Sequence, residues 1–240
     1  MNIVITGASK GFGKAIAGVF AADKQEHHLF LCARNKDELE QAGKSLQDSY
    51  PGNTVHIKTC DVANRESLAA FAAWVLAAVD KVDILVNNAG IYLPGSAYGE
   101  ADGMLEKMME VNVYSAYHLT RMILPAMMGE KSSPEKGGHI FNICSIASLQ
   151  AYPNGGAYSI SKFAMYGFSK NLREEMKPHG IKVTHVLPGA AYTDSWSGSG
   201  VDPKRIMEAV DIARMIHASA QLSPQACVEE IVLRPQSGDL

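Results

Sequence analysis

The segment Thr6-Gly7-Ala8-Ser9-Lys10-Gly11-Phe12-Gly13 is the most informative part of the chain about its fold. It follows a short β-branched run at residues 3–6 and precedes helical spacing of apolar residues over 14–22, so we expect a strand, a tight turn and a helix. Glycines permit the turn and let the backbone approach a pyrophosphate, whose charge then meets the N-terminus of the helix. Glycine-rich turns without a ligand also occur, but this context favours dinucleotide binding through Gly7, Ser9, Lys10, Gly11, Phe12 and Gly13.

The same alternation continues along the whole chain. Six further short apolar runs lie at residues 29–33, 55–59, 84–87, 140–144, 183–187 and 231–233. Longer segments with helical spacing, such as 68–79 and 163–176, lie between them. Strands that alternate with helices indicate repeated β-α-β units and a parallel sheet covered on both faces. We therefore predict an α/β fold, a single doubly wound Rossmann domain over residues 1–240 with a parallel seven-stranded sheet and helices on both faces. Residues 129–138 are expected to form a surface loop.

Composition excludes several classes of protein. The 240 residues are 47% hydrophobic and 20% charged, which is typical of a globular domain. A formal net charge of −3 argues against a nucleic-acid partner. Four scattered cysteines and eight histidines show no ligand spacing, so we predict neither disulfides nor a metal site. No apolar run approaches the ~20 residues that span a bilayer, and we recognise no signal peptide, so we expect no membrane partner and a cytoplasmic location.

The end of the second predicted strand bears on the choice of dinucleotide. An acidic residue at this point accepts a hydrogen bond from the ribose 2′-hydroxyl of NAD. This chain has Ala33 and Arg34 there, with Lys10 in the glycine turn and no carboxylate at the strand end. A guanidinium suits a 2′-phosphate, so NADPH or NADP is predicted in preference to NAD. Alternatively, Arg34 is a solvated charge that follows a strand.

Further motifs extend the pattern over nearly the whole length. Asn87-Asn88-Ala89-Gly90 ends the fourth predicted strand, and Tyr158-Ser159-Ile160-Ser161-Lys162 has Y-x-x-x-K spacing. Together with the T-G-x-x-x-G-x-G turn, these motifs resemble the short-chain dehydrogenase/reductase family in its single-domain form. The resemblance implies catalytic roles for Asn112, Ser145, Tyr158 and Lys162. It also implies cofactor contacts by Asp61, Val62, Asn88, Ala89, Gly90, Tyr158, Lys162, Pro188, Gly189 and Thr193.

Carbonyl reduction needs such a set of side chains. The developing alkoxide requires a proton, which a tyrosine supplies poorly while its pKa stays near 10. Tyr158 and Lys162 project from one face of a predicted helix, so the ammonium is expected to lower the pKa of the tyrosine. Ser145 would polarise the carbonyl oxygen, and Asn112 would hold a water that connects Lys162 to solvent. The alternative for Tyr158 is a half-buried packing residue.

The substrate side is less specific. Residues 194–203 are polar, glycine-rich and aperiodic, which predicts a mobile cover over the active site. Tyr152, Tyr192 and Trp196 are predicted as aromatic walls for a compact, flat or apolar carbonyl compound, although Trp196 alternatively anchors the loop. Segments 188–193 and 229–239 are similar to sepiapterin-reductase-like and carbonyl-reductase members of the family.

The predicted activity is hydride transfer from NADPH to a ketone or aldehyde of a small molecule, with Tyr158 as the acid, in a homodimer or homotetramer. Two alternatives within the family are a 3-oxoacyl thioester (acyl-carrier-protein) reductase and a sepiapterin or pteridine reductase. A non-enzymatic alternative is an NADPH-sensing regulator. A sensor has no need for the complete set of Ser145, Tyr158 and Lys162, so we favour an enzyme.

Overall fold

The computed structural model describes residues 1–128, 137–193 and 200–239. Seven strands form one parallel sheet in the order β3-β2-β1-β4-β5-β6-β9. The strands are β1 (Asn2–Thr6), β2 (His28–Ala33), β3 (Thr54–Thr59), β4 (Ile84–Asn87), β5 (His139–Ile143), β6 (Lys182–Pro188) and β9 (Glu230–Leu233). The predicted α/β fold with a seven-stranded parallel sheet is confirmed, and every predicted strand end lies within one residue of an observed one.

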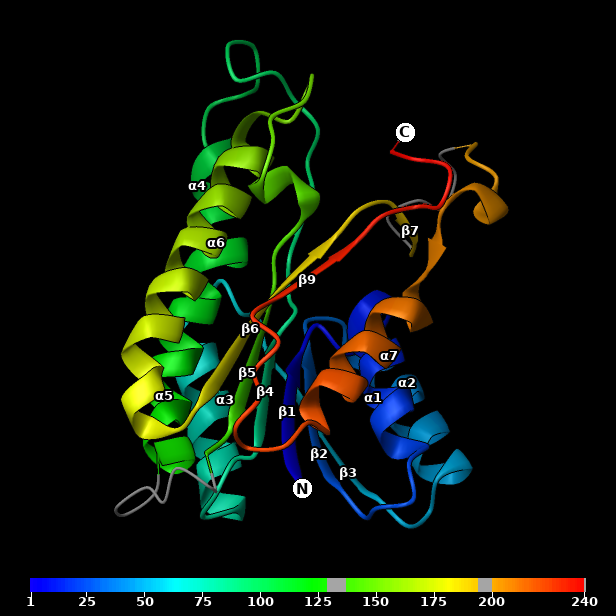
Figure 1. The fold of residues 1–240 in the computed structure, drawn as a ribbon, viewed down its shortest axis with the longest axis vertical. Coiled ribbons are helices and arrows are strands. Elements are labelled where there is room, and N and C mark those ends of the chain that lie inside the picture. The colour runs from blue at the N-terminus through cyan, green and yellow to red at the C-terminus, as the bar shows by residue number, and fades with distance from the viewer. Residues whose placement is uncertain (129–136, 194–199, 240) are drawn as a thin grey trace.

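Helices cover both faces of the sheet (Figure 1). One layer contains α1 (Gly11–Ala21), α2 (Lys36–Ser49) and α7 (Ala209–Ala220), and the other contains α3 (Arg65–Ala78), α5 (Ser115–Met128) and α6 (Gly156–Met176). Successive residues of a strand point to opposite faces, so Ile3 and Ile5 join the core beneath the first layer while Val4 joins the second. Burial on both faces explains why the strands are almost continuously apolar.

Short elements complete the chain. They are α4 (Met104–Met109), the π-helix η1 (Glu110–Tyr114), the 3₁₀ turns η3 (Ile146–Ser148), η4 (Lys177–His179) and η6 (Pro203–Arg205), and the strands β7 (Ala191–Tyr192) and β8 (Met207–Glu208). β7 and β8 pair with each other in a separate two-stranded sheet. Most of the loop predicted at 129–138 lies outside the described residues. In the ranges that the structure covers, each helix is too short or too polar to traverse a bilayer.

The order of the strands positions the functional edge. From β1 the chain builds outward to β3, then returns to place β4 on the other side of β1. In open α/β sheets, ligands bind at this switch point, outside the carboxyl ends of the strands. The glycine turn follows β1 and the N-N-A-G motif follows β4, so both motifs lie at the switch point.

Candidate active site

The glycine turn and the N-N-A-G motif are bonded into one unit. Asn88 Nδ2 donates to the carbonyl oxygens of Thr6 and Gly7 at 2.8 and 3.1 Å. Thr6 Oγ1 in turn accepts from the backbone N–H groups of Asn88 and Ala89 at 3.0 and 2.9 Å. These bonds fix the position of the turn relative to the end of β4.

Two glycines of the turn have no room for a side chain. A Cβ on Gly13 would lie 2.3 Å from the Gly7 oxygen and 2.6 Å from Asn88 Nδ2. Gly7 has a φ of +65°, and a Cβ there would lie 3.0 Å from the Ala89 Cα. A side chain at either position would force the turn open. The close approach of the backbone therefore explains the glycine spacing.

The first turn of α1 fits an anionic ligand. At the start of α2 and α3, Asn35 and Asn64 accept hydrogen bonds from first-turn N–H groups. At the start of α1, the side chain of Lys10 gives no such cap, and the first turn contains no acidic residue. These N–H groups and the positive end of the helix dipole suit the pyrophosphate of a dinucleotide. The residues present therefore fit such a cofactor.

Gly13→Ala is expected to weaken NADPH binding at least about tenfold, because a Cβ cannot be accommodated without moving backbone at Gly7. Gly18→Ala is the matched control in the same helix, since its Cβ would meet only Leu46 Cδ2 at 4.0 Å. Gly18→Ala is expected to bind NADPH with the affinity of the wild type. Its free energy of unfolding is expected to be about 0.5–1 kcal/mol higher, because alanine has a higher helix propensity than glycine. Fluorescence titration and thermal unfolding measure both effects. Normal NADPH affinity in Gly13→Ala would contradict the assignment of the turn.

Ser145, Tyr158 and Lys162 lie together at the same edge of the sheet. Lys162 Nζ is 5.8 Å from the centroid of the Tyr158 ring and donates to the Ile143 carbonyl at 2.9 Å. The side chain of Ser145, just beyond β5, forms a hydrogen bond with Tyr158. The structure thus brings these three predicted residues into one cluster, and their catalytic roles stay a proposal.

Ser148 was not predicted from the sequence, yet it fixes Ser145 relative to α6. Its Oγ accepts from the Ser145 N–H at 3.3 Å and donates to the Lys162 carbonyl at 2.8 Å. Ser145 Oγ accepts from the Ala147 N–H at 3.1 Å, which leaves the hydroxyl proton of Ser145 available to another acceptor. The only signal in the sequence is a serine three residues after Ser145, the spacing of a capping box.

Asn112 lies in the π-helix η1, a feature that is frequent at functional sites. Its Oδ1 accepts from the Ile91 N–H at 2.7 Å, and its Nδ2 donates to the Ile91 carbonyl and to Ser161 Oγ at 3.0 and 2.9 Å. Through these hydrogen bonds Asn112 connects the segment after β4 to α6. A Cβ on Gly90 would lie 3.3 Å from Asn112 Oδ1 and 3.7 Å from Lys162 Nζ, so both groups flank this glycine. The predicted role in holding a water stays a prediction.

Burial controls the protonation of Tyr158 and Lys162. It lowers the pKa of Lys162 to about 8. It also raises the pKa of Tyr158, and the hydrogen bond with Ser145 offsets this only in part. The net pKa of Tyr158 is raised because desolvation of the phenolate outweighs the hydrogen bond with Ser145, and the lowering of this pKa by Lys162 stays a prediction. Tyr158 is a neutral phenol at pH 7, the form that donates a proton.

Aromatic residues surround Tyr158. Tyr92 packs edge-to-face against it, with ring centroids 4.9 Å apart, and was not predicted although it follows the N-N-A-G motif closely. Tyr152 is 37% exposed and interacts electrostatically with Tyr158 and Tyr92, and its role as a wall of the substrate site stays a prediction. Tyr192 is 43% exposed and lines an open groove of about 1150 Å³ with Arg205. Trp196 and residues 194–199 of the predicted cover lie outside the described residues.

The remaining cofactor positions follow the carboxyl ends of other strands. Arg34 is exposed directly after β2, and Asp61 begins a turn after β3 in which its carboxylate accepts from the Ala63 N–H at 3.1 Å.

At the end of β6, the Gly189 N–H donates to the Leu233 carbonyl at 2.8 Å. A Cβ on Gly11 would lie 3.5 Å from Thr193 Cγ2, so Thr193 lies beside the glycine turn. The remaining predicted contacts, Phe12, Val62 and Pro188, are partly or fully buried at this edge. What each residue binds stays a proposal.

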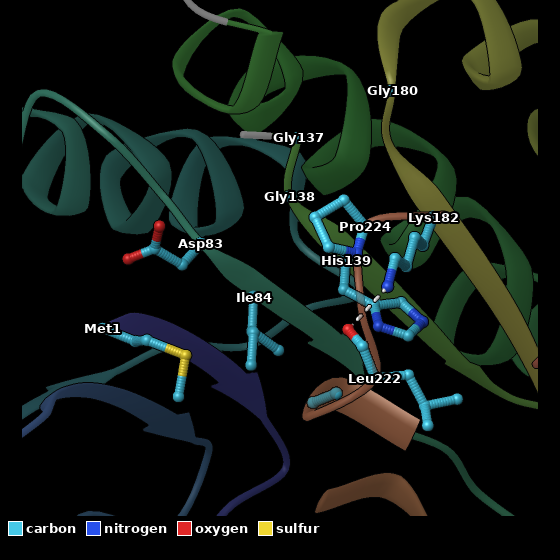
Figure 2. A pocket seen from close by; sticks show the side chains of 11 residues that line it. Met1, Asp83, Ile84, Gly137, Gly138, His139, Gly180, Lys182, Leu222 and Pro224 are labelled. Carbon is cyan, nitrogen blue, oxygen red and sulfur yellow. Dashed lines mark hydrogen bonds between the residues drawn. The ribbon is translucent and has the colours of Figure 1, made fainter. Parts of the chain in front are cut away.

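A separate cavity of about 160 Å³ lies at the opposite edge, near the amino ends of β4, β5 and β6 (Figure 2). Lys182 Nζ points to the Leu222 carbonyl, at 3.1 Å, and also donates to the Ser223 carbonyl at 2.6 Å. Burial lowers the pKa of His139 to about 3, so its imidazole is neutral. This cavity holds no acid–base set of the kind found around Tyr158. Among the described residues, no three His, Cys, Asp or Glu side chains are grouped as a metal site.

A glycine turn at the switch point, with a partly buried tyrosine and a buried lysine beside it, is the arrangement of a nucleotide-dependent oxidoreductase. The sequence model of a protein family described as "short chain dehydrogenase" matches residues 1–202 of the chain. The chain belongs to the short-chain dehydrogenase/reductase family, as its motifs indicate, and is an oxidoreductase. This membership favours an enzyme over a non-catalytic sensor.

Several relatives are similar to the chain over most of its length. Sepiapterin reductase of Chlorobaculum tepidum is 31% identical and covers 99% of this chain and 97% of that protein. Mouse dehydrogenase/reductase SDR family member 7B is 38% identical over 80% of this chain, which spans only 58% of that protein. Among solved structures, an alcohol dehydrogenase from Thermococcus sibiricus complexed with 5-hydroxy-NADP has a TM-score of 0.88 at 28% identity, covering 100% and 98% of the two chains. L-sorbose reductase from Gluconobacter frateurii, complexed with NADPH and L-sorbose, has a TM-score of 0.86 at 28% identity, covering 97% and 94%.

Proposed function

We propose that the protein reduces a ketone or aldehyde carbonyl of a small molecule, with NADPH as the hydride donor. The cluster of Ser145, Tyr158 and Lys162, at the sheet edge that also carries the glycine turn, is the observation on which the proposal rests. NADPH supplies the hydride when bound. The side chains of the cluster supply the proton and stabilise the charge.

Each residue of the cluster has a distinct task. Ser145 donates a hydrogen bond to the substrate oxygen and polarises the carbonyl while keeping its own proton. Tyr158 donates a proton to the developing alkoxide, and because an alkoxide is a stronger base than a phenolate, the raised pKa of Tyr158 does not prevent the transfer. The Lys162 ammonium stabilises the phenolate and, with a pKa of about 8, returns a proton to it. Alcohol oxidation uses the same groups in reverse.

The preference for NADP(H) rests on positive side chains at the ribose end of the site. Arg34 is exposed immediately after β2, and Lys10 belongs to the turn that precedes α1. A guanidinium forms paired, charge-assisted hydrogen bonds with a phosphate. The 5-hydroxy-NADP and NADPH bound to the two structural relatives support the same preference.

A small, free substrate fits the surroundings of Tyr158 better than a protein-bound thioester. Tyr92 and Tyr152 offer ring faces and edges for a flat compound, and the sepiapterin reductase relative supports a pteridine as one candidate. A carrier protein would require a basic docking surface. The C-terminal end of α6, where Lys177 pairs with Glu174 at 2.5 Å, lies at the opposite edge of the sheet beside Gly180 and Lys182, so these residues do not supply that surface.

We also propose a homodimer or homotetramer, with the outer surface of α5 and α6 as the contact. Tyr117 packs against Phe168 with ring centroids 5.5 Å apart, so the two helices present one surface. Large apolar side chains are exposed on these helices and on the adjoining η1, namely Tyr117, Ile160 and Phe163 on the helices and Tyr114 on η1. Such a patch is typical of a subunit interface. The cytoplasmic location stays a prediction.

The proposed function predicts that NADPH is consumed with a small free carbonyl compound. The measurement is loss of absorbance at the nicotinamide band with an aromatic diketone, sepiapterin, L-sorbose and a 3-oxoacyl thioester, with NADH in parallel. We expect kcat/KM to be about ten- to a hundredfold higher with NADPH, the range of one charge-assisted phosphate contact. Cofactor binding without turnover of any carbonyl, or a thioester that is better by orders of magnitude, would contradict the proposal.

A further inference from the structure

A carboxylate that was not predicted lies at the ribose end of the candidate cofactor site. Glu38 Oε2 accepts from Ser9 Oγ at 3.4 Å, and Glu38 Oε1 lies 3.7 Å from Lys10 Nζ. Ala33 at the end of β2 and Arg34 directly after it gave no sign of an acidic group near the glycine turn. The strand end itself carries no carboxylate, but the first turn of the next helix brings one to the glycine turn.

The start of α2 explains why Glu38 is held at this position. Asn35 caps the helix by accepting from the Glu38 N–H at 3.2 Å. Glu38 and Asp37 are the acidic residues of the first turn, where the helix dipole favours negative charge. The contacts of Glu38 therefore join the beginning of α2 to the turn between β1 and α1.

The Glu38 carboxylate and the 2′-phosphate of NADP(H) bind the same kinds of hydrogen-bond donor. Both are anions that accept hydrogen bonds from a hydroxyl and an ammonium, and Ser9 and Lys10 supply these two donors. A 2′-phosphate that binds these donors must displace Glu38 and then remains beside a negative charge. A 2′-hydroxyl carries no such charge, and it can donate a hydrogen bond to the carboxylate where it stands.

We propose that Glu38 competes with the 2′-phosphate of NADP(H) for Ser9 and Lys10, and thereby limits the discrimination between NADP(H) and NAD(H). This inference rests on the proposed function, because it assumes that the glycine turn binds the cofactor. Arg34 and Glu38 then act in opposite directions on the same ligand group. The affinity for NADPH is the balance of the two.

The expected effect of Glu38 on NADPH affinity depends on how far solvent screens its charge. The side chains of Glu38 and Lys10 are 40% and 56% exposed, so solvent screens their interactions. A unit charge a few ångströms from a phosphate in such surroundings changes binding by about three- to tenfold. The same screening predicts a smaller effect at high ionic strength.

The test compares dissociation constants for NADPH, NADH and adenosine 2′,5′-bisphosphate, measured by calorimetry. Glu38→Gln is expected to bind NADPH and the bisphosphate about three- to tenfold more tightly, with no gain for NADH, and the gain is expected to shrink in high salt. Glu40→Gln is the matched control, because it makes the same charge change on the same helix, where Glu40 pairs with Lys36 at 3.7 Å. The control is expected to change affinity by less than about twofold.

The outcomes separate the two proposals. Equal NADPH affinity in Glu38→Gln and the wild type overturns the competition and leaves the proposed function intact. An equal loss of affinity for all three ligands also overturns it, since Glu38 would then organise the turn. A wild type that prefers NADH, with Arg34→Ala having no effect, overturns the assignment of NADPH itself. Glu38→Asp provides a second variant that keeps the helix charge and withdraws it from Ser9, so an intermediate gain is expected.

Discussion

Replacing Tyr158 by phenylalanine is expected to lower kcat for carbonyl reduction by roughly 10²–10⁴-fold while NADPH still binds. The change deletes the hydroxyl that donates the proton and forms the hydrogen bond with Ser145. The ring is kept, and with it the edge-to-face contact with Tyr92 at 4.9 Å. Steady-state kinetics give kcat, and a fluorescence titration gives the affinity for NADPH. A loss confined to kcat identifies Tyr158 as the proton donor.

Tyr166→Phe is the matched control for this change. Tyr166 lies on the same helix, where its hydroxyl bonds with Glu230 and accepts from Lys170 Nζ at 3.1 Å, outside the Ser145 cluster. The control is expected to retain activity within a few-fold of the wild type. If Tyr158→Phe also retains more than about a tenth of the activity, proton donation by Tyr158 is wrong.

The parts of the fold that were predictable have one physical origin. A strand buried on both faces is apolar throughout, so all seven strands of the main sheet were found from sequence. Apolar spacing found α6 only from residue 163, because its first two turns bury the polar residues Ser159, Ser161 and Lys162 and so lack an apolar stripe, and only the Y-x-x-x-K motif placed Tyr158 on the helix. β7 and β8 are two residues each, too short to show alternation.

In the candidate site too, some features were predictable from the sequence and others were not. A position where the backbone leaves no room for a Cβ can be recognised in the sequence, because only glycine fits there. Gly13 is an example. Contacts between elements are not visible, so Ser148, Tyr92 and Glu38 emerged only from the structure. The pKa of Tyr158 also depends on its burial, which spacing along a helix does not report.

Lys162 should also affect stability as a function of pH. Burial lowers its pKa to about 8, from about 10.4 in an unfolded chain, so between these values the unfolded state binds more protons. The contribution of Lys162 to the free energy of unfolding therefore increases as the pH rises from about 8 towards 10.4, and Lys162→Met is expected to lack this increase. Loss of the bond to the Ile143 carbonyl is expected to cost about 1–3 kcal/mol in addition. Thermal unfolding across this pH range measures both contributions.

The effect of Lys162→Met on catalysis is expected to be larger, a fall in kcat of roughly 10²-fold or more. In the wild type, Lys162 is an ammonium below pH 8 and neutral above it, so kcat for reduction is expected to fall as the pH rises through about 8. Methionine fills a similar volume without a charge, so in the variant this decline moves upward, towards the raised pKa of Tyr158. Lys170→Met, at an exposed position of the same helix, is expected to keep the wild-type profile. A decline at pH 8 that persists in Lys162→Met would show that another group titrates there.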